Sequence, residues 1–254
     1  MADQAVTQSG AVKAPAGGKL PARRALRIAQ KLCRFGWWWA WYILVGRGRG
    51  IQGMADFVAW DPIVRASQVA SELAALGQIL ADLRPERAME IGTYAGGTLF
   101  FLTRLASPDA TIISIDLPGG RFGGGYGTLR KWVYQRFARG RQGLHLFQGD
   151  SHASEMLNRV KEVLGGQPLD YLFIDGDHTY EGVRKDFEMY GPLVRRGGVI
   201  ALHDIVEHPP ETGCEVSRFW NEIKTQYRHR ELIENANQGW AGIGVIYVDQ
   251  PADR

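Results

Sequence analysis

The chain of 254 residues is 45% hydrophobic and 22% charged, a balance typical of a protein that buries a sizeable core. Its formal net charge of +3 is too small to favour nucleic acid as the main partner, so we expect none. The two cysteines, Cys33 and Cys214, share no motif. This excludes a disulfide framework and a Cys-x-x-Cys metal site, and it predicts reduced, cytosolic thiols.

The N-terminal region divides into two parts. Residues 1–20 are rich in Ala, Gly, Gln and Lys, and are predicted to form a disordered tail. Residues 21–60 are basic and Trp-rich, and are predicted to form a helical extension. Its apolar part is shorter than the roughly 20 residues of a membrane-spanning helix, and no signal-peptide cleavage pattern follows it. We expect it to pack on the domain or on a second subunit of a homo-oligomer; peripheral membrane contact through residues 21–45 is the alternative.

From residue 61 onward, helical and strand patterns alternate. Asp61–Pro62 is a typical helix start, and the apolar stripe from Ile63 to Leu83 predicts a long amphipathic helix. A strand over residues 88–91 then runs into a glycine-rich turn and a helix. The further predicted strands are residues 111–116, 144–147, 171–174 and 199–202, a short strand near Leu232, and residues 242–248. Three further helices are predicted: one ends near Gly140, one follows Thr179, and one spans about residues 214–227. One α/β domain over residues 61–254, with about seven strands, follows from this pattern.

Two of these strands end abruptly in clusters of polar residues. One runs into Asp175-Gly-Asp-His178, and the next runs into His203-Asp204. Both are apolar throughout, as expected of strands buried on both faces of a parallel sheet. Open α/β sheets bind ligands at the carboxyl ends of their strands. We therefore expect Asp175, His178, His203 and Asp204 to face one crevice.

The turn after the first strand predicts the position of a ligand. Its sequence, Glu90-Ile-Gly92-Thr93-Tyr94-Ala-Gly96, lets the backbone approach a ligand closely at the start of a helix. It is neither the Gly-x-Gly-x-x-Gly of a dinucleotide site nor a phosphate-binding loop with its lysine. A ligand without phosphate groups is therefore favoured. Its expected contacts are the numbered residues of this turn, Glu90, Gly92, Thr93, Tyr94 and Gly96.

Two further strand ends carry acids. Asp116 is placed to accept hydrogen bonds from two ribose hydroxyl groups, and Asp150-Ser151 can accept one from an exocyclic amine. Together with the acid beside the glycine turn, these groups describe a site for S-adenosylmethionine. Each piece alone is weak, because Asp favours the turns that follow strands.

The motifs EIGTYAGG, SIDL, GDS, FIDGDHTYEGVRKD and GPLVRRGGVIALHD, in this order, resemble the class I S-adenosylmethionine-dependent methyltransferases. The similarity is to the bacterial branch of macrolide-sugar and rhamnosyl O-methyltransferases and cephalosporin-hydroxylase-like proteins, over roughly residues 60 to 250. The resemblance implies a Rossmann-like, doubly wound sheet of seven strands, with an antiparallel last strand at residues 242–248. It also implies that Asp175 contacts S-adenosylmethionine.

In the metal-dependent sugar methyltransferases of this branch, the Asp of the DGxH motif and an acidic pair after the next strand hold Mg²⁺, and the DGxH histidine is the proposed base. The resemblance thus implies Asp175 and Asp204 as metal ligands and His178 as the general base, with Asp175 beside it. His203 stands where those enzymes carry a carboxylate. Mg²⁺ prefers oxygen ligands, so the alternatives to Mg²⁺ are Mn²⁺, Fe²⁺ or no metal. His203 is expected either to bind the ion or only to orient Asp204.

The predicted function is O-methylation of a hydroxyl group on a sugar or glycosylated small molecule, in the cytoplasm or at the inner membrane face. A dinucleotide-dependent oxidoreductase and a non-catalytic, membrane-associated S-adenosylmethionine-binding protein are the alternatives. The acceptor is expected to meet the loops at residues 118–127 and 207–213, where His208 lies, with the segment 37–60 and His152 as further candidates.

Overall fold

The computed structural model describes residues 50–61 and 63–248. The predicted tail over residues 1–20 lies outside the described residues, as does the segment 21–45 for which membrane contact was the alternative. Of the predicted helical extension, Gly50–Trp60 is described and forms helix α2. Within the described ranges, no helix is long and apolar enough to cross a membrane.

The centre of the domain is a sheet of seven strands in the order β3-β2-β1-β4-β5-β7-β6. All neighbours from β3 to β5 are parallel, and β7 is antiparallel to both β5 and β6. The predicted doubly wound sheet with an antiparallel last strand is therefore confirmed. The strands are β1 (Arg87–Ile91), β2 (Thr111–Asp116), β3 (Gly143–Gln148), β4 (Leu169–Ile174), β5 (Val194–His203), β6 (Arg228–Leu232) and β7 (Ile243–Tyr247).

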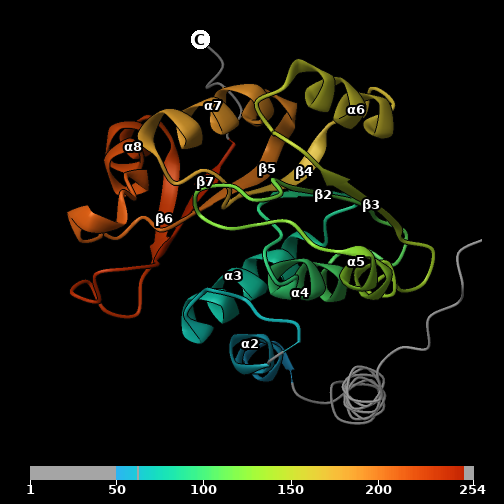
Figure 1. Cartoon of the computed structure of the whole chain (residues 1–254), viewed down its shortest axis with the longest axis horizontal. Helices are drawn as coiled ribbons and strands as arrows, with labels where there is room; N and C mark the ends of the chain where they lie inside the picture. Colours follow the sequence, from blue (N-terminus) through green and yellow to red (C-terminus); the bar gives the residue numbers. More distant parts are fainter. Residues whose placement is uncertain (1–49, 62, 249–254) are drawn as a thin grey trace, which may run out of the picture. The chain divides into compact units, whose positions relative to one another are not determined.

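Helices cover both faces of the sheet (Figure 1). One face is covered by α3 (Ala70–Leu83), α4 (Gly97–Leu105) and α5 (Thr128–Tyr134), with α2 packed on α3 and α4. The other is covered by α6 (Ser154–Leu164), α7 (Tyr180–Tyr190) and α8 (Val216–Ile223). Short 3₁₀ turns are η1 (Gly191–Leu193), η2 (Pro210–Thr212) and η3 (Lys224–Gln226). Helix α6 was not predicted, and α5 ends at Tyr134 and not near Gly140.

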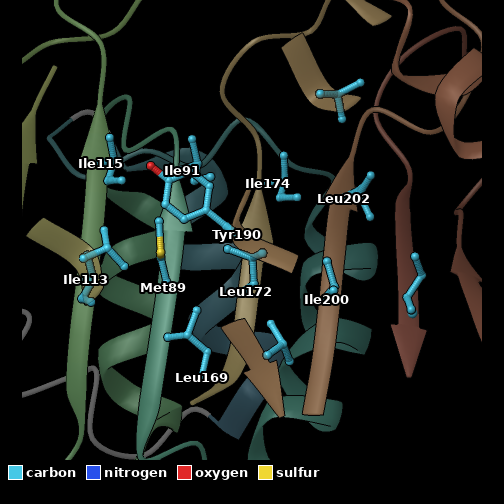
Figure 2. Close-up of a cluster of buried hydrophobic side chains, with 14 of the residues drawn as sticks. Met89, Ile91, Ile113, Ile115, Leu169, Leu172, Ile174, Tyr190, Ile200 and Leu202 are labelled. Carbon is cyan, nitrogen blue, oxygen red and sulfur yellow. The ribbon is translucent and has the colours of Figure 1, made fainter. Parts of the chain in front are cut away.

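Alternate side chains of the central strands form the core on the α6–α8 side (Figure 2). Met89 and Ile91 of β1 lie there beside Leu172 and Ile174 of β4, because successive residues of a strand point to opposite faces. Tyr190 of α7 is fully buried among them, and its hydroxyl donates to a backbone carbonyl in the loop after β3 (2.7 Å). This bond fixes a loop at the carboxyl edge of the sheet.

The prediction of a helix beginning at Asp61 is wrong. The Asp61 carboxylate accepts hydrogen bonds from the amides of Ile63 (2.8 Å) and Val64 (2.7 Å), which stabilises a turn in place of a helix. Arg65 then pairs through its backbone with the glycine-rich turn after β1, and α3 begins only at Ala70. The intervening segment is thereby fixed against the carboxyl edge of the sheet.

Candidate active site

A cavity of about 510 Å³ lies at the carboxyl ends of the parallel strands. It brings together nine residues that the sequence predicted as site residues, from the carboxyl ends of five strands and the loops that follow them. These are Gly92, Tyr94, Asp116, Asp150, Ser151, Asp175, His178, His203 and Asp204. The other three predicted residues, Glu90, Thr93 and Gly96, are not among the residues that line it. His152 and His208, named as possible acceptor contacts, do line it.

Glu90 lies beneath the opposite face of the sheet. Its neighbours Met89 and Ile91 point toward α6–α8, so Glu90 points toward α3 and α4, where Leu76 and Phe101 lie near it. It is 1% exposed, and burial raises the pKa of its carboxyl group to about 8. The alternation of side chains along β1 is a signal in the sequence that could have placed it there.

Gly92 brings the turn after β1 against the end of β4. Its φ is +94°, and a Cβ atom added to it would lie 1.9 Å from the carbonyl oxygen of Asp175. Only glycine allows this approach. The predicted cofactor turn and the predicted acidic cluster are therefore in direct backbone contact.

Asp116 is tied to the glycine-rich loop that follows it. One carboxylate oxygen accepts from the amides of Thr93 (3.1 Å) and Tyr94 (3.4 Å), and the other accepts from the amide of Gly125. Burial raises the pKa of Asp116, against these backbone hydrogen bonds. The loop at residues 118–127 thus closes over the Asp116 end of the cavity.

The same loop reaches the acidic cluster at the other end of the cavity. The ring of Phe122 stacks on the ring of His178, with centroids 4.7 Å apart and planes 12° from parallel. Both side chains line the cavity. No motif in the sequence indicated this contact, because it depends on the path of an irregular loop.

The loop after β3 is held by a buried ion pair. His152 Nε2 lies 3.2 Å from Asp186 Oδ1, and Asp186, in α7, has no exposed surface. The hydrogen bond that the His152 ring donates to the Asp186 carboxylate raises the pKa of His152 above its usual value, although burial opposes this. The Asp150 carboxylate accepts from the His152 amide (2.8 Å), so the predicted adenine contact is part of the same turn.

Two carboxylates and three imidazoles meet at the ends of β4 and β5. His203 Nδ1 lies 3.1 Å from Asp175 Oδ1 and 3.2 Å from Asp204 Oδ1. His178 lies between the same carboxylates, with Nδ1 3.0 Å from Asp204 Oδ2 and Nε2 3.5 Å from Asp175 Oδ1. His208 Nε2 is 3.2 Å from Asp204 Oδ1. The prediction that the two strand ends form one crevice therefore agrees with the geometry.

The charges of this cluster compensate one another. Burial alone would raise the pKa of Asp175, but the charge of His203 and the hydrogen bond of His178 hold it below its usual value. Burial would lower the pKa of His178, but hydrogen bonds to Asp175, Asp204 and Cys214 raise it to about 12. The charges of the two carboxylates likewise raise the pKa of His203 to about 10, against burial. Each imidazole is thus held in its protonated form near neutral pH.

The predicted metal ligands lie close enough to share an ion. One donor atom each from Asp175, His203 and Asp204 lies within 4.8 Å of the other two. Gln68, which the sequence did not indicate, holds this site from the segment before α3: its Nε2 donates to Asp175 Oδ2 (2.7 Å). Gln68 is 4% exposed, and its Oε1 has no partner among the described residues.

The loop before β7 completes the cavity wall with Trp240, whose side chain is 45% exposed. Glu72 of α3 is buried and accepts from the amides of Glu234 (3.0 Å) and Gly242 (2.9 Å), which fixes the loop at both flanks. The amide of Ala241 donates to Asp204 Oδ1 (3.1 Å). The position of Trp240 is thus coupled to the acidic cluster.

Comparison with known proteins agrees with this geometry. Residues 89–205 match the model of a family described as methyltransferase domain. Catechol O-methyltransferase B from Danio rerio is 29% identical over 133 residues, which cover 52% of this chain and 47% of that enzyme. The match thus spans about half the length of that relative.

Solved structures share the fold at low sequence identity. The O-methyltransferase TomG from Streptomyces achromogenes, involved in tomaymycin synthesis and solved with S-adenosylmethionine, superimposes with a TM-score of 0.55 at 17% identity, over 83% of this chain and 95% of that one. An O-methyltransferase from Bacillus cereus, solved with S-adenosylhomocysteine, gives 0.52 at 17% identity, over 78% of this chain and 90% of that one.

Proposed function

We propose that the chain is a class I, S-adenosylmethionine-dependent methyltransferase, and that it transfers the methyl group to a hydroxyl group of a sugar or glycosylated small molecule. One observation carries this proposal. One cavity is lined both by Gly92, Asp116 and Asp150 and by the cluster of Asp175, His178 and Asp204. A glycine turn and strand-end acids like the first three residues are typical of a nucleoside-binding site. Donor and acceptor can therefore meet in one cavity.

The donor is proposed to lie over the glycine turn, with its ribose at Asp116. The Asp116 carboxylate already accepts three backbone amides, one of them from Gly125. A ribose diol would use the remaining lone pairs or replace the Gly125 amide. In the second case, binding of the donor would release the Gly125 amide and alter the position of the loop at residues 118–127.

The acceptor proton is proposed to pass to His178, while the O–CH₃ bond forms and the S–CH₃ bond of the sulfonium breaks. Asp175 and Asp204 hold the ring in place from its two nitrogen atoms. They also raise the pKa of His178 to about 12, through hydrogen bonds that outweigh burial, so the ring must first lose its proton. Base catalysis therefore requires that the negative charge of the two carboxylates be offset.

A divalent ion is proposed to provide this offset, held by Asp175, His203 and Asp204. Two carboxylate oxygens and one imidazole nitrogen fit Mn²⁺ or Fe²⁺ better than Mg²⁺. When bound, such an ion would also lower the pKa of the acceptor hydroxyl group. His203 already faces both carboxylates with Nδ1, and it would bind the ion through this nitrogen once its proton is lost.

The acceptor is proposed to enter beside Trp240 and Phe122. Trp240 is partly exposed and lines the cavity, and an indole ring is a suitable surface for the apolar face of a sugar ring. Cytoplasmic location, self-association and membrane contact through residues 21–45 stay predictions.

Two measurements test this function. Calorimetry should show one S-adenosylhomocysteine bound per chain and no binding of NAD; the opposite result would favour the oxidoreductase. Transfer of labelled methyl groups to a panel of hydroxylated glycosides should then fall about 10²–10⁴-fold in His178→Gln, with S-adenosylhomocysteine affinity retained. Unchanged transfer in this variant would exclude His178 as the base.

A further inference from the structure

The thiol of Cys214 lies beside the acidic cluster, although the sequence suggested only a reduced thiol without a role. Cys214 is half-buried in the loop between η2 and α8. Its sulfur lies within 4.8 Å of donor atoms of His178 and Asp204. Burial would raise the pKa of the thiol, but interaction with the imidazoles of His178 and His208 lowers it. Each of these imidazoles also contacts the carboxylate of Asp204, at 3.0 and 3.2 Å. Sulfur, nitrogen and oxygen donors thus converge around one carboxylate.

The backbone fixes this convergence. The amide of Glu215, the residue after Cys214, donates to the carbonyl oxygen of His178 (2.8 Å). The amide of Cys214 itself donates to Thr212 Oγ1 (3.2 Å). The loop that carries the thiol is therefore joined directly to the residue that carries the nearest imidazole, so the distance between them does not depend on side-chain packing alone.

We propose that His178, Asp204 and Cys214 form a binding site for a thiophilic divalent transition ion such as Zn²⁺. One donor atom from each lies within 4.8 Å of the other two. A tetrahedral zinc ion with bonds of about 2.0–2.3 Å separates its donors by about 3.3–3.7 Å, so small rotations of these side chains suffice. His208, 3.2 Å from the same carboxylate, is a further donor.

An ion can reach this site, because His178, Asp204 and His208 all line the cavity. Thiolate and imidazole ligands favour Zn²⁺ or Co²⁺ over Mg²⁺ and Ca²⁺. The site shares Asp204 with the set of Asp175 and His203, but that set contains no sulfur. The proposal concerns binding alone, and its tests do not depend on methyl transfer. Because the ion would occupy the His178 ring and Asp204, it would exclude base catalysis by His178 while it is bound.

The first test uses Co²⁺ as a spectroscopic substitute for Zn²⁺ in the full, reduced chain. A thiolate bound to Co²⁺ gives a charge-transfer band in the near ultraviolet, which carboxylate and imidazole ligands do not give. The band should appear in the wild type and in Cys33→Ser, be absent in Cys214→Ser, and disappear when Zn²⁺ is added. Cys33 lies outside the described residues and provides the control for the other thiol of the chain.

The second test needs no variant, and so covers the case in which Cys214→Ser does not fold. Saturating Zn²⁺ should slow alkylation of Cys214 by iodoacetamide at least about tenfold, measured on the Cys214 peptide by mass spectrometry. Mg²⁺ at the same concentration should give no protection, and the rate at Cys33 should not change. The proposal is overturned if the reduced wild type gives no band, if the band survives in folded Cys214→Ser, or if Zn²⁺ leaves the alkylation of Cys214 unchanged.

Discussion

Glu90→Gln tests whether this strand residue is a buried, protonated acid. Glu90 is 1% exposed and accepts a hydrogen bond from the Ser114 hydroxyl (2.9 Å). Burial raises its pKa from 4.5 to about 8, against hydrogen bonds from Ser114 and Thr98. Between these two values the folded chain retains a proton that the unfolded chain has lost. Stability is therefore lost as the pH rises through this window.

The size of the effect follows from the two pKa values. Each pH unit within the window lowers the free energy of unfolding by about 1.4 kcal/mol, so this group accounts for a loss of about 4 kcal/mol between pH 5 and pH 8. The amide group that replaces the carboxyl group in the variant retains an oxygen for Ser114 and does not ionise. Relative to the wild type, Glu90→Gln should therefore gain about 4 kcal/mol of stability over the same range.

Urea unfolding followed by tryptophan fluorescence measures this difference directly. Both proteins are compared at pH 5 and pH 8, since the contributions of all other titrating groups cancel in the difference. Glu155→Gln, at an exposed position in α6, is the matched control and should show no such gain. A difference between Glu90→Gln and the wild type that is the same at both pH values would refute the buried, protonated state of Glu90.

Three further predictions concern the cavity. Gly92→Ala should lose about 3 kcal/mol or more of unfolding free energy in urea, since its Cβ would meet the Asp175 carbonyl. The control Gly165→Ala, also at positive φ but in open space, should lose about 1 kcal/mol, and equal losses in the two variants would contradict the close approach. Asp116→Asn should weaken S-adenosylhomocysteine binding at least about tenfold by calorimetry, and unchanged affinity would remove the ribose contact. Asp204→Asn should abolish both the stimulation of methyl transfer by Mn²⁺ and its loss in EDTA; persistent stimulation would place the ion elsewhere.

The positions of Asp116, Asp175 and Asp204 were predictable, because each ends or directly follows a largely apolar strand. Once the strands are parallel neighbours, their carboxyl ends share one edge, and residues far apart in the chain must meet there. Strand identity and direction were sufficient for this step. The exact distances were not needed.

Residues held by irregular segments were not predictable in the same way. Gln68 reaches Asp175 only because the turn at Asp61 replaces the expected helix start. Phe122 and Cys214 lie on irregular loops that are held by several backbone hydrogen bonds, and these loops bring both residues to His178. Local sequence patterns indicate where a loop begins and ends, but they do not specify its path between those points.

The loop before β7 has anchored flanks and exposed residues between them. Its flanks are clamped by Glu72, while Asn235 and Asn237 between them are exposed. Insertions or exchanges at these exposed positions would reshape the neighbourhood of Trp240 and leave the clamps, and the Ala241 bond to Asp204, in place. This segment is therefore a natural point at which evolution or protein engineering could retarget the domain to a different acceptor without rebuilding its chemistry.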